Sequence, residues 1–365
     1  MGVMLHSARV GSLLLAAFVV AGCEKKAAQE SAPPAPAAAA PAPPAAAADK
    51  AKLALFKPLR ASFDEPALGT NAARVELGQK LYFDPRLSKG QQISCSSCHD
   101  LAKYGQDGEA TSPGHRGQRG GRNSPTTLNA AGHVRQFWDG RMANVEEQAH
   151  GPVTNPIEMA MADGAAVEKV LRSIPEYVRS FAAAFADDKQ PVTFDNMARA
   201  IAAFERRLVT PSRWDAFLRG DEGALTAPEK AGFGTFVAKG CAACHNGELV
   251  GGGTFQKLGV KEPYPTADLG RFEATKQEAD RSVFKVPSLR NIAKTAPYFH
   301  DGQVKTLEEA VRLMGKHQLG FALAPEEIAS IVAFLGALTG DLPPELAKAP
   351  ELPKSTKATP KPDLH

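Results

Sequence analysis

The motif Cys-x-x-Cys-His occurs twice in this chain, at residues 95–99 and 241–245. Two cysteines at this spacing can hold a zinc ion, form a disulfide or attach a haem. A four-cysteine zinc ribbon separates its cysteine pairs by roughly 15–20 residues, but 142 residues lie between Cys98 and Cys241. A thioredoxin-like redox pair needs a βαβ setting, and no such strand pattern surrounds either motif. The repeat therefore favours haem, with one similar module built around each motif.

Cysteine usage supports this interpretation. The chain has five cysteines, and all but Cys23 belong to the two motifs. In such a motif the thiols form thioethers with the haem vinyl groups, and the adjacent histidine binds the iron. The sequence predicts two covalently bound haems c. Their attachment points and proximal ligands are Cys95, Cys98 and His99 in the first motif and Cys241, Cys244 and His245 in the second.

The remaining cysteine, Cys23, directly follows a predicted export signal. Arg9 precedes an apolar run over residues 10–22, which is too short to cross a membrane as a mature helix. Small residues directly before Cys23 resemble the bacterial lipoprotein cleavage box. We therefore expect a lipoprotein-type signal peptide over residues 1–22 and a lipidated Cys23 that tethers the protein to an envelope membrane in the periplasm. An ordinary signal peptide with an incidental cysteine is the alternative.

The segment after this signal, residues 23–50, consists largely of Ala and Pro. Such a tract cannot bury a core, so we expect a disordered, semi-stiff linker. The charge of the whole chain is nearly balanced, with 43 basic and 40 acidic residues. No long basic run is interleaved with aromatic residues, which argues against a nucleic-acid partner.

Beyond the linker the chain has mainly helical patterns. Apolar residues recur at helical spacing over residues 71–83 and 194–209, and residues 324–340 form an apolar amphipathic pattern. Capping residues predict further helix starts at Thr226 and Thr306. The predicted fold class is mainly α, with two cytochrome c-like (class I) haem domains. Their expected extents are residues 51–209 and 210–345, followed by a tail over residues 346–365.

Each iron also needs a residue on its other face. After His245 the chain has one methionine, Met314, together with His300, His317 and His365. Met314 is the sole thioether available to the second iron, so we expect it to bind this iron. The alternative is that Met314 only packs in the hydrophobic core. Methionine–histidine ligation favours ferrous iron and raises the reduction potential. For the first iron, His115 competes with other histidines and methionines, and a lone histidine in such a glycine-rich loop is more often an exposed residue without this role.

Several further segments occur in the order typical of one family. They are residues 80–88, 122–126, 137–141, 173–178, 194–201, 240–247 and 289–304. Through these segments the chain resembles the bacterial dihaem cytochrome c peroxidases from about Leu53 to about Pro353. The resemblance implies a periplasmic oxidoreductase that removes hydrogen peroxide by reducing it to water. Electrons would come from a small monohaem cytochrome c or a copper protein (a cupredoxin), and the protein would be a homodimer.

The resemblance also implies roles for individual residues. The first haem would be the peroxidatic one, with His115 as its removable distal ligand and with Gln148 and Glu158 as the polar pair on its distal side. Trp138 would lie between the two haems. The second haem, with Met314, would receive electrons. Asn123 and the carbonyls of Thr295 and Pro297 would bind calcium, for which oxygen ligands are suited.

Other interpretations remain open from the residues alone. Without the resemblance, a solvated loop acid is the favoured interpretation of Glu158, and Trp138 is equally a core residue. The chain as a whole could be a dihaem electron-transfer cytochrome without peroxidase activity, with both irons permanently six-coordinate. A relative of the methylamine-utilisation dihaem enzyme is a third possibility, but that branch has tyrosine where this chain has Met314.

Overall fold

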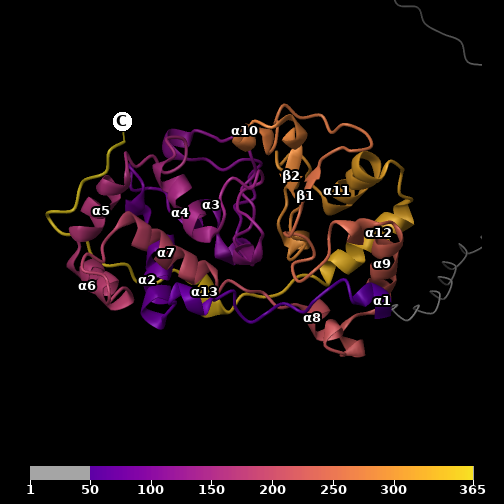
Figure 1. Ribbon diagram of the computed structural model, residues 1–365, viewed down its shortest axis with the longest axis horizontal. Helices are drawn as coiled ribbons and strands as arrows, with labels where there is room; N and C mark the ends of the chain where they lie inside the picture. Colours follow the sequence, from indigo (N-terminus) through magenta and orange to yellow (C-terminus); the bar gives the residue numbers. More distant parts are fainter. Residues whose placement is uncertain (1–49, 365) are drawn as a thin grey trace, which may run out of the picture. The chain divides into compact units, whose positions relative to one another are not determined.

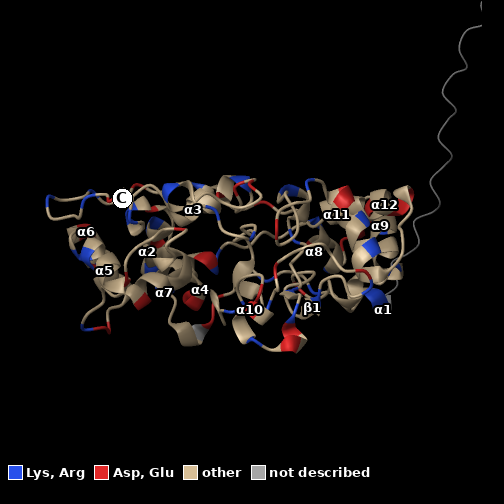
Figure 2. Ribbon diagram, turned by 90° about the horizontal axis from the view of Figure 1, so that it is seen from above, with Lys and Arg blue, Asp and Glu red and all other residues tan. Residues whose placement is uncertain are grey.

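The computed structural model describes residues 50–364 (Figure 1). The predicted signal peptide, the predicted lipid site Cys23 and the Ala/Pro-rich segment up to residue 49 lie outside the described residues, as does His365. None of the described helices combines the length and the apolar character that crossing a membrane would require. Figure 2 shows Lys and Arg mixed with Asp and Glu along the described chain, in keeping with the balanced composition.

The described chain is mainly helical, as the sequence predicts. The α-helices are α1 (Lys50–Leu53), α2 (Ala72–Phe83), α3 (Cys95–Cys98), α4 (Val145–Thr154), α5 (Gly164–Arg172), α6 (Pro175–Ala184), α7 (Phe194–Glu205), α8 (Arg213–Leu218), α9 (Ala227–Ala238), α10 (Phe272–Thr275), α11 (Leu307–Met314), α12 (Pro325–Gly336) and α13 (Pro344–Ala347). The strands β1 (Phe255–Lys257) and β2 (Val283–Lys285) pair antiparallel, with Phe255 opposite Lys285.

Capping residues begin the helices where the sequence predicts. The side chain of Asn71 accepts a hydrogen bond from the N–H of Arg74 at the start of α2. Thr226 and Glu229 form the predicted capping box of α9, and Thr306 caps α11. Each cap satisfies an N–H group that the first helical turn leaves without a partner.

Two helices end earlier than their apolar periodicity predicts. Helix α7 ends at Glu205 because the carbonyl of Leu208 accepts a hydrogen bond from the N–H of Asn129, a contact distant in sequence. Helix α12 ends at Gly336, and the following turn is held by Asn291, whose side chain accepts a hydrogen bond from the N–H of residue 340. Tertiary hydrogen bonds thus replace the last helical ones.

Two hydrophobic clusters form most of the core. The first is built from α2, α4, α5, α6 and α7, and the second from α8, α9, α11 and α12. Figure 1 shows α2, α6 and α7 grouped together on the left and α9, α11 and α12 on the right. Cys95 packs against the first cluster and Cys241 against the second. Each haem motif therefore lies beside its own core.

Both clusters contain a close helix–helix contact at a glycine. A Cβ atom on Gly78 of α2 would lie 1.9 Å from the carbonyl oxygen of Ala200 in α7. A Cβ atom on Gly232 of α9 would lie 2.0 Å from the carbonyl oxygen of Ser330 in α12. The absence of a side chain lets the two backbones touch. The same kind of contact thus joins α2 to α7 in the first cluster and α9 to α12 in the second.

The ends of the described chain cross from one cluster to the other. Phe56, which the sequence analysis assigns to the first domain, packs in the second cluster, where its ring lies 5.5 Å from those of Trp214 and Phe233. The C-terminal segment lies on the first cluster, where Arg86 donates a hydrogen bond to the carbonyl of Pro353 at 2.7 Å. These two end segments connect the clusters.

Candidate functional site

Two cavities lie beside the two Cys-x-x-Cys-His motifs. The first has a volume of about 820 Å³ and is lined by Cys95, Cys98 and His99, among others. The second has a volume of about 240 Å³, and its lining includes Cys241, Cys244, His245 and Met314. The structure thus brings the predicted attachment cysteines and the proximal histidine of each motif to one cavity wall.

Local backbone structure positions both motifs. Helix α3 is a single turn made of Cys95 to Cys98, so the two thiols lie on one helical face. The N–H of His99 closes this turn by donating to the carbonyl of Cys95 at 2.9 Å. The second motif forms a 3₁₀ turn that follows Gly240, a residue in the left-handed region at φ 88°. His245 again donates its N–H to the first cysteine of its motif.

Burial sets the protonation states of these groups. The four motif cysteines are not paired in disulfides. Burial raises the pKa of the Cys98 and Cys241 thiols to about 11. Burial also lowers the pKa of His99, and that of His245 to about 4, so both imidazoles are neutral at pH 7. Neutral imidazole is the form that binds a metal.

These residues fit a covalently attached haem. At each motif two thiols and one neutral imidazole line the same cavity, and these are the donors that two thioether bonds and one iron ligand require. Nowhere in residues 50–364 do three or more His, Cys, Asp or Glu side chains gather as metal ligands. The donor set therefore suits a haem iron held by one histidine on its proximal face, and not a zinc ion held by a cluster of side chains.

The first cavity also contains the predicted distal pair. Gln148, on α4, and Glu158 both line it. The carboxylate of Glu158 accepts a hydrogen bond from the side chain of Asn155 at 2.9 Å. Burial raises the pKa of Glu158, while the charge of Arg141 and the Asn155 hydrogen bond act in the opposite direction. A carboxyl with a raised pKa binds a proton more readily than an exposed carboxyl does.

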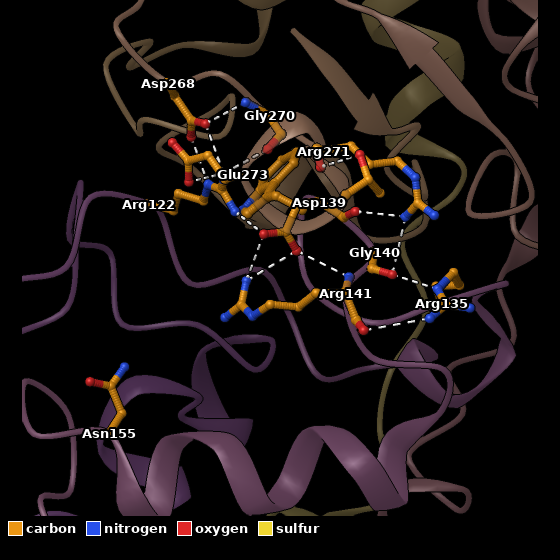
Figure 3. Close-up of polar contacts among 12 residues, drawn as sticks. Arg122, Arg135, Asp139, Gly140, Arg141, Asn155, Asp268, Gly270, Arg271 and Glu273 are labelled. Atoms are coloured by element: carbon orange, nitrogen blue, oxygen red, sulfur yellow. Dashed lines mark hydrogen bonds and ion pairs between the residues drawn. The ribbon is translucent and has the colours of Figure 1, made fainter. Parts of the chain in front are cut away.

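A network of ion pairs holds Arg141 at this cavity (Figure 3). Both carboxylate oxygens of Asp139 accept hydrogen bonds from Arg141 Nη1 at 3.0 Å. Asp139 also pairs with Arg122, at 2.6 Å. Arg122 in turn binds Asp268, which follows the second motif in the chain, through two hydrogen bonds of 2.6 and 2.7 Å. The network joins the first cavity to the part of the chain that carries the second motif.

The loop with His115 packs closely against the Glu158 segment. The main-chain N–H of His115 donates to the carbonyls of Ile157 and Glu158, at 2.9 and 2.7 Å. Gly114 permits this approach, because a Cβ atom there would lie 2.0 Å from the Ile157 carbonyl oxygen. His115 is buried, but Gly114 and not His115 is among the residues that line the first cavity. Its role as an iron ligand therefore stays a prediction.

Met314 and His245 line the same cavity, as a pair of axial ligands requires. Met314 is the last residue of α11, and a π-helical turn follows it over residues Gly315–Leu319. Turns of this kind inside helices occur frequently at functional sites. The geometry is compatible with ligation of the second iron, which the structure does not test.

Trp138 and Asn123 lie between the cavities, and both line each of them. The indole N–H of Trp138 donates to the carbonyl of Asn123 at 2.9 Å, and its ring lies edge-on to His300 at 6.5 Å. Thr295 and Pro297 line the second cavity together with Asn123. The three residues predicted to bind calcium therefore line the same cavity, and calcium binding itself stays a prediction.

Charged residues in the cavity walls that escaped sequence reasoning include Arg141, Glu205 and Lys285. Glu205 ends α7 and is 5% exposed; burial, together with the neighbouring charge of Glu146, raises its pKa to about 8. One signal could have found it, because Glu205 occurs four residues after Ile201 on the apolar face of the predicted helix. For Arg141 and Lys285 the sequence carries no comparable local signal.

Comparisons with known proteins agree with this geometry. Residues 72–223 match the family described as "Di-haem cytochrome c peroxidase". A protein of Pseudomonas aeruginosa named cytochrome c551 peroxidase is 48% identical over 316 residues, which cover 85% of this chain and 90% of that protein. A protein of the same name from Nitrosomonas europaea is 50% identical over 294 residues, which cover 80% of this chain and 86% of that protein.

Solved structures show the same relationship. The crystal structure of a MauG-like protein associated with microbial copper homeostasis matches with a TM-score of 0.70 and 29% sequence identity. The match covers 80% of this chain and 95% of that chain. The similarity in fold therefore extends over most of the described chain.

Proposed function

Because the chain belongs to the di-haem cytochrome c peroxidase family, we propose that it reduces hydrogen peroxide to water with electrons from a small monohaem cytochrome c or a copper protein. The observation that carries this function is the first cavity, which combines Cys95, Cys98 and His99 with the carboxyl of Glu158. A site that only passes electrons needs no such acid at its open face.

The reaction takes two electrons and two protons for each peroxide and releases two waters. When bound, the two haems supply the iron at which peroxide reacts and the store of electrons. The protein must move a proton between the two peroxide oxygens. Glu158 performs this transfer: Oε1 is engaged by Asn155, which leaves Oε2 to accept the proton from one oxygen and return it to the other. Gln148 orients the peroxide from the same cavity wall.

The remaining residue roles belong to this proposal. His115 is the removable distal ligand of the first iron, and the burial of this residue next to Glu158 supports a link between ligand release and the acid. Met314 is the sixth ligand of the second iron. Trp138, which lines both cavities, carries electrons between them. Asn123 and the carbonyls of Thr295 and Pro297 hold calcium at the junction.

The wider organisation is proposed in the same way. Two cytochrome c-like, class I haem domains meet near residues 209–210, which is supported by a first cluster that ends at Leu208 and a second that resumes at Trp214. The protein acts in the periplasm as a homodimer, tethered by a lipidated Cys23 through the linker. The support for this tether is the run of small residues directly before Cys23.

The decisive experiment compares Glu158→Gln with the unaltered protein. The variant should keep two covalent haems, seen by mass spectrometry, and nearly normal haem spectra. Its peroxide turnover with reduced cytochrome c should fall by roughly 10²-fold or more, the scale of acid–base catalysis. Glu147→Gln is the matched control, since Glu147 is an exposed carboxylate directly before Gln148 and outside the cavity wall. Normal turnover in Glu158→Gln would remove Glu158 from the mechanism, and an unaltered protein with two haems but no turnover would be an electron carrier.

A further inference from the structure

Lys285 is at the junction of the two cavities. Six residues line both of them, and Lys285 is the one charged residue among these six; the others are Asn123, Ser124, Pro125, Thr126 and Trp138. Lys285 is the last residue of β2, and its main-chain N–H donates to the carbonyl of Trp138 at 2.8 Å. This bond holds the strand end against the segment that follows the first motif.

The ammonium group of Lys285 is buried without a counter-charge. The residue is 6% exposed, and Nζ donates to the carbonyl of Arg135 at 2.9 Å. Within residues 50–364, no carboxylate forms an ion pair with Lys285. Asp139 acts on it through its charge, but Figure 3 shows that the Asp139 carboxylate is already occupied by Arg122 and Arg141. Burying a charge without a partner is costly.

His133 adds a second unsatisfied donor beside it. Nζ of Lys285 lies 3.0 Å from Nδ1 of His133. Burial lowers the pKa of Lys285 to about 7. In its charged form this amine can only donate, so Nδ1 then accepts and the ring proton is on Nε2. This Nε2 atom is buried and has no hydrogen-bond partner within the described part of the chain. Leaving a buried donor unsatisfied is unfavourable, because the group has lost its hydrogen bonds to water.

An acceptor that carries negative charge would satisfy both groups. Each haem brings two propionate carboxylates, and both Lys285 and His133 line the first cavity, whereas His133 does not line the second. We propose that Lys285 and His133 form the binding site for a propionate carboxylate of the haem in the first cavity. This inference rests on the proposed two-haem function. It extends that proposal to the residues that bind the haem at the edge that carries its propionates.

The site has an electrostatic consequence. A buried ammonium close to a haem favours the reduced form, which carries one positive charge fewer than the oxidised form. Hydrogen bonds between charged groups are also about twice as strong as neutral ones, so the pair fixes the haem edge as well. Salt screens a buried charge only weakly. Removing the charge should therefore lower the reduction potential of the first haem at any ordinary ionic strength.

The test measures the reduction potentials of both haems by spectroelectrochemical titration. In Lys285→Met the equilibrium constant for one-electron reduction of the first haem should fall at least tenfold, which corresponds to a potential about 59 mV lower. Lys285→Arg keeps the charge and should stay close to the unaltered protein. Lys305→Met is the matched control, because Lys305 is exposed and lines neither cavity. An unchanged first-haem potential in Lys285→Met, or a shift of the second haem alone, would overturn the proposal.

A second measurement keeps the proposal testable if Lys285→Met does not fold. Infrared difference spectra between oxidised and reduced unaltered protein, with and without ¹⁵N-lysine, should contain an ammonium band that appears with reduction of the first haem. Its absence would contradict the proposal. Haem content and peroxide turnover of the unaltered protein report on the proposed function separately. Two haems and normal turnover, combined with an unchanged potential in Lys285→Met, would reject this inference alone.

Discussion

Glu158 is subject to opposing influences on its pKa. Burial in the first cavity raises this pKa above the ordinary value of 4.5, and the charge of Arg141 and the hydrogen bond from Asn155 lower it. A proton acceptor must be ionised, so activity that is present above the folded-state pKa is lost as the pH falls through it. Because the pKa is raised, we expect the acid limb of the activity profile above pH 4.5.

Arg141→Gln should move this limb to higher pH. The substitution removes the positive charge that lowers the pKa of Glu158, and the raising effect of burial remains. The measurement is kcat/KM for peroxide across the acid range at low salt, since the Arg141 side chain is 38% exposed and its effect is partly screened. Arg141→Lys retains the charge and is the control. If the acid limbs of the kcat/KM profiles of Arg141→Gln and the unaltered protein coincide, Arg141 does not affect the pKa of Glu158.

At the scale of elements, the two modules repeat one packing contact. Helices α9 and α12 meet at Gly232, and α2 and α7 meet at Gly78, in each case with a backbone carbonyl where a side chain would be. Rigid helix backbones cannot move apart at one point without disturbing the rest of the core. The glycine therefore sets the distance between the helices that flank each haem motif.

Gly232→Ala should destabilise the second module by about 1–3 kcal/mol, the usual effect of overpacking a core. Gly234 offers a control in the same helix, because a Cβ atom there meets nothing within 4 Å. Gly234→Ala should be neutral or stabilise by up to about 1 kcal/mol, since alanine is the better helix former. Denaturant unfolding followed by circular dichroism gives both values. Equal stability of the two variants would show that α9 and α12 tolerate a wider separation.

At the scale of the whole described chain, the two end segments tie the clusters together. Phe56 is buried with the second cluster although it precedes the first in sequence. The C-terminal segment binds the first cluster through Arg86 and Gln91, which donate to the carbonyls of Pro353 and Pro360 at 2.7 and 2.8 Å. The second module is therefore completed by Phe56, which precedes the first cluster in sequence. The first module is completed by the C-terminal segment, which follows the second cluster.

Deletion of residues 350–365 should lower the stability of the first module. Arg86 is buried and would lose its bonds to Pro353 and Ser355, and an unsatisfied buried donor costs about 1–3 kcal/mol. The measurement is the thermal transition of the haem-loaded protein by calorimetry. Deletion of residues 361–365 alone is the control, since it retains the bonds to Pro353, Ser355 and Pro360. Identical transitions for the two deletions would show that the tail is only attached to the surface.

Much of the chemistry could be predicted from the sequence because it depends on residues that are close together in the chain. A Cys-x-x-Cys-His motif places two thiols and an imidazole together by local backbone geometry, and a capping residue such as Thr226 needs only its own first turn. Helix existence and starts followed from such patterns. The ends of α7 and α12 did not, because Asn129 and Asn291 redirect the backbone through bonds that are distant in sequence.

By itself, the amino-acid sequence determined which groups can bind haem, where helices such as α2, α9 and α11 begin, and which family the chain resembles. Only the tertiary structure decided that Lys285 is buried between the cavities, that Asp139 holds Arg141 beside Glu158, and that the chain ends cross between the clusters. The physical reason is desolvation. From its neighbours in sequence alone, a charged residue is expected to be exposed to water. Whether it is buried depends on segments distant in sequence that pack around it and exclude water.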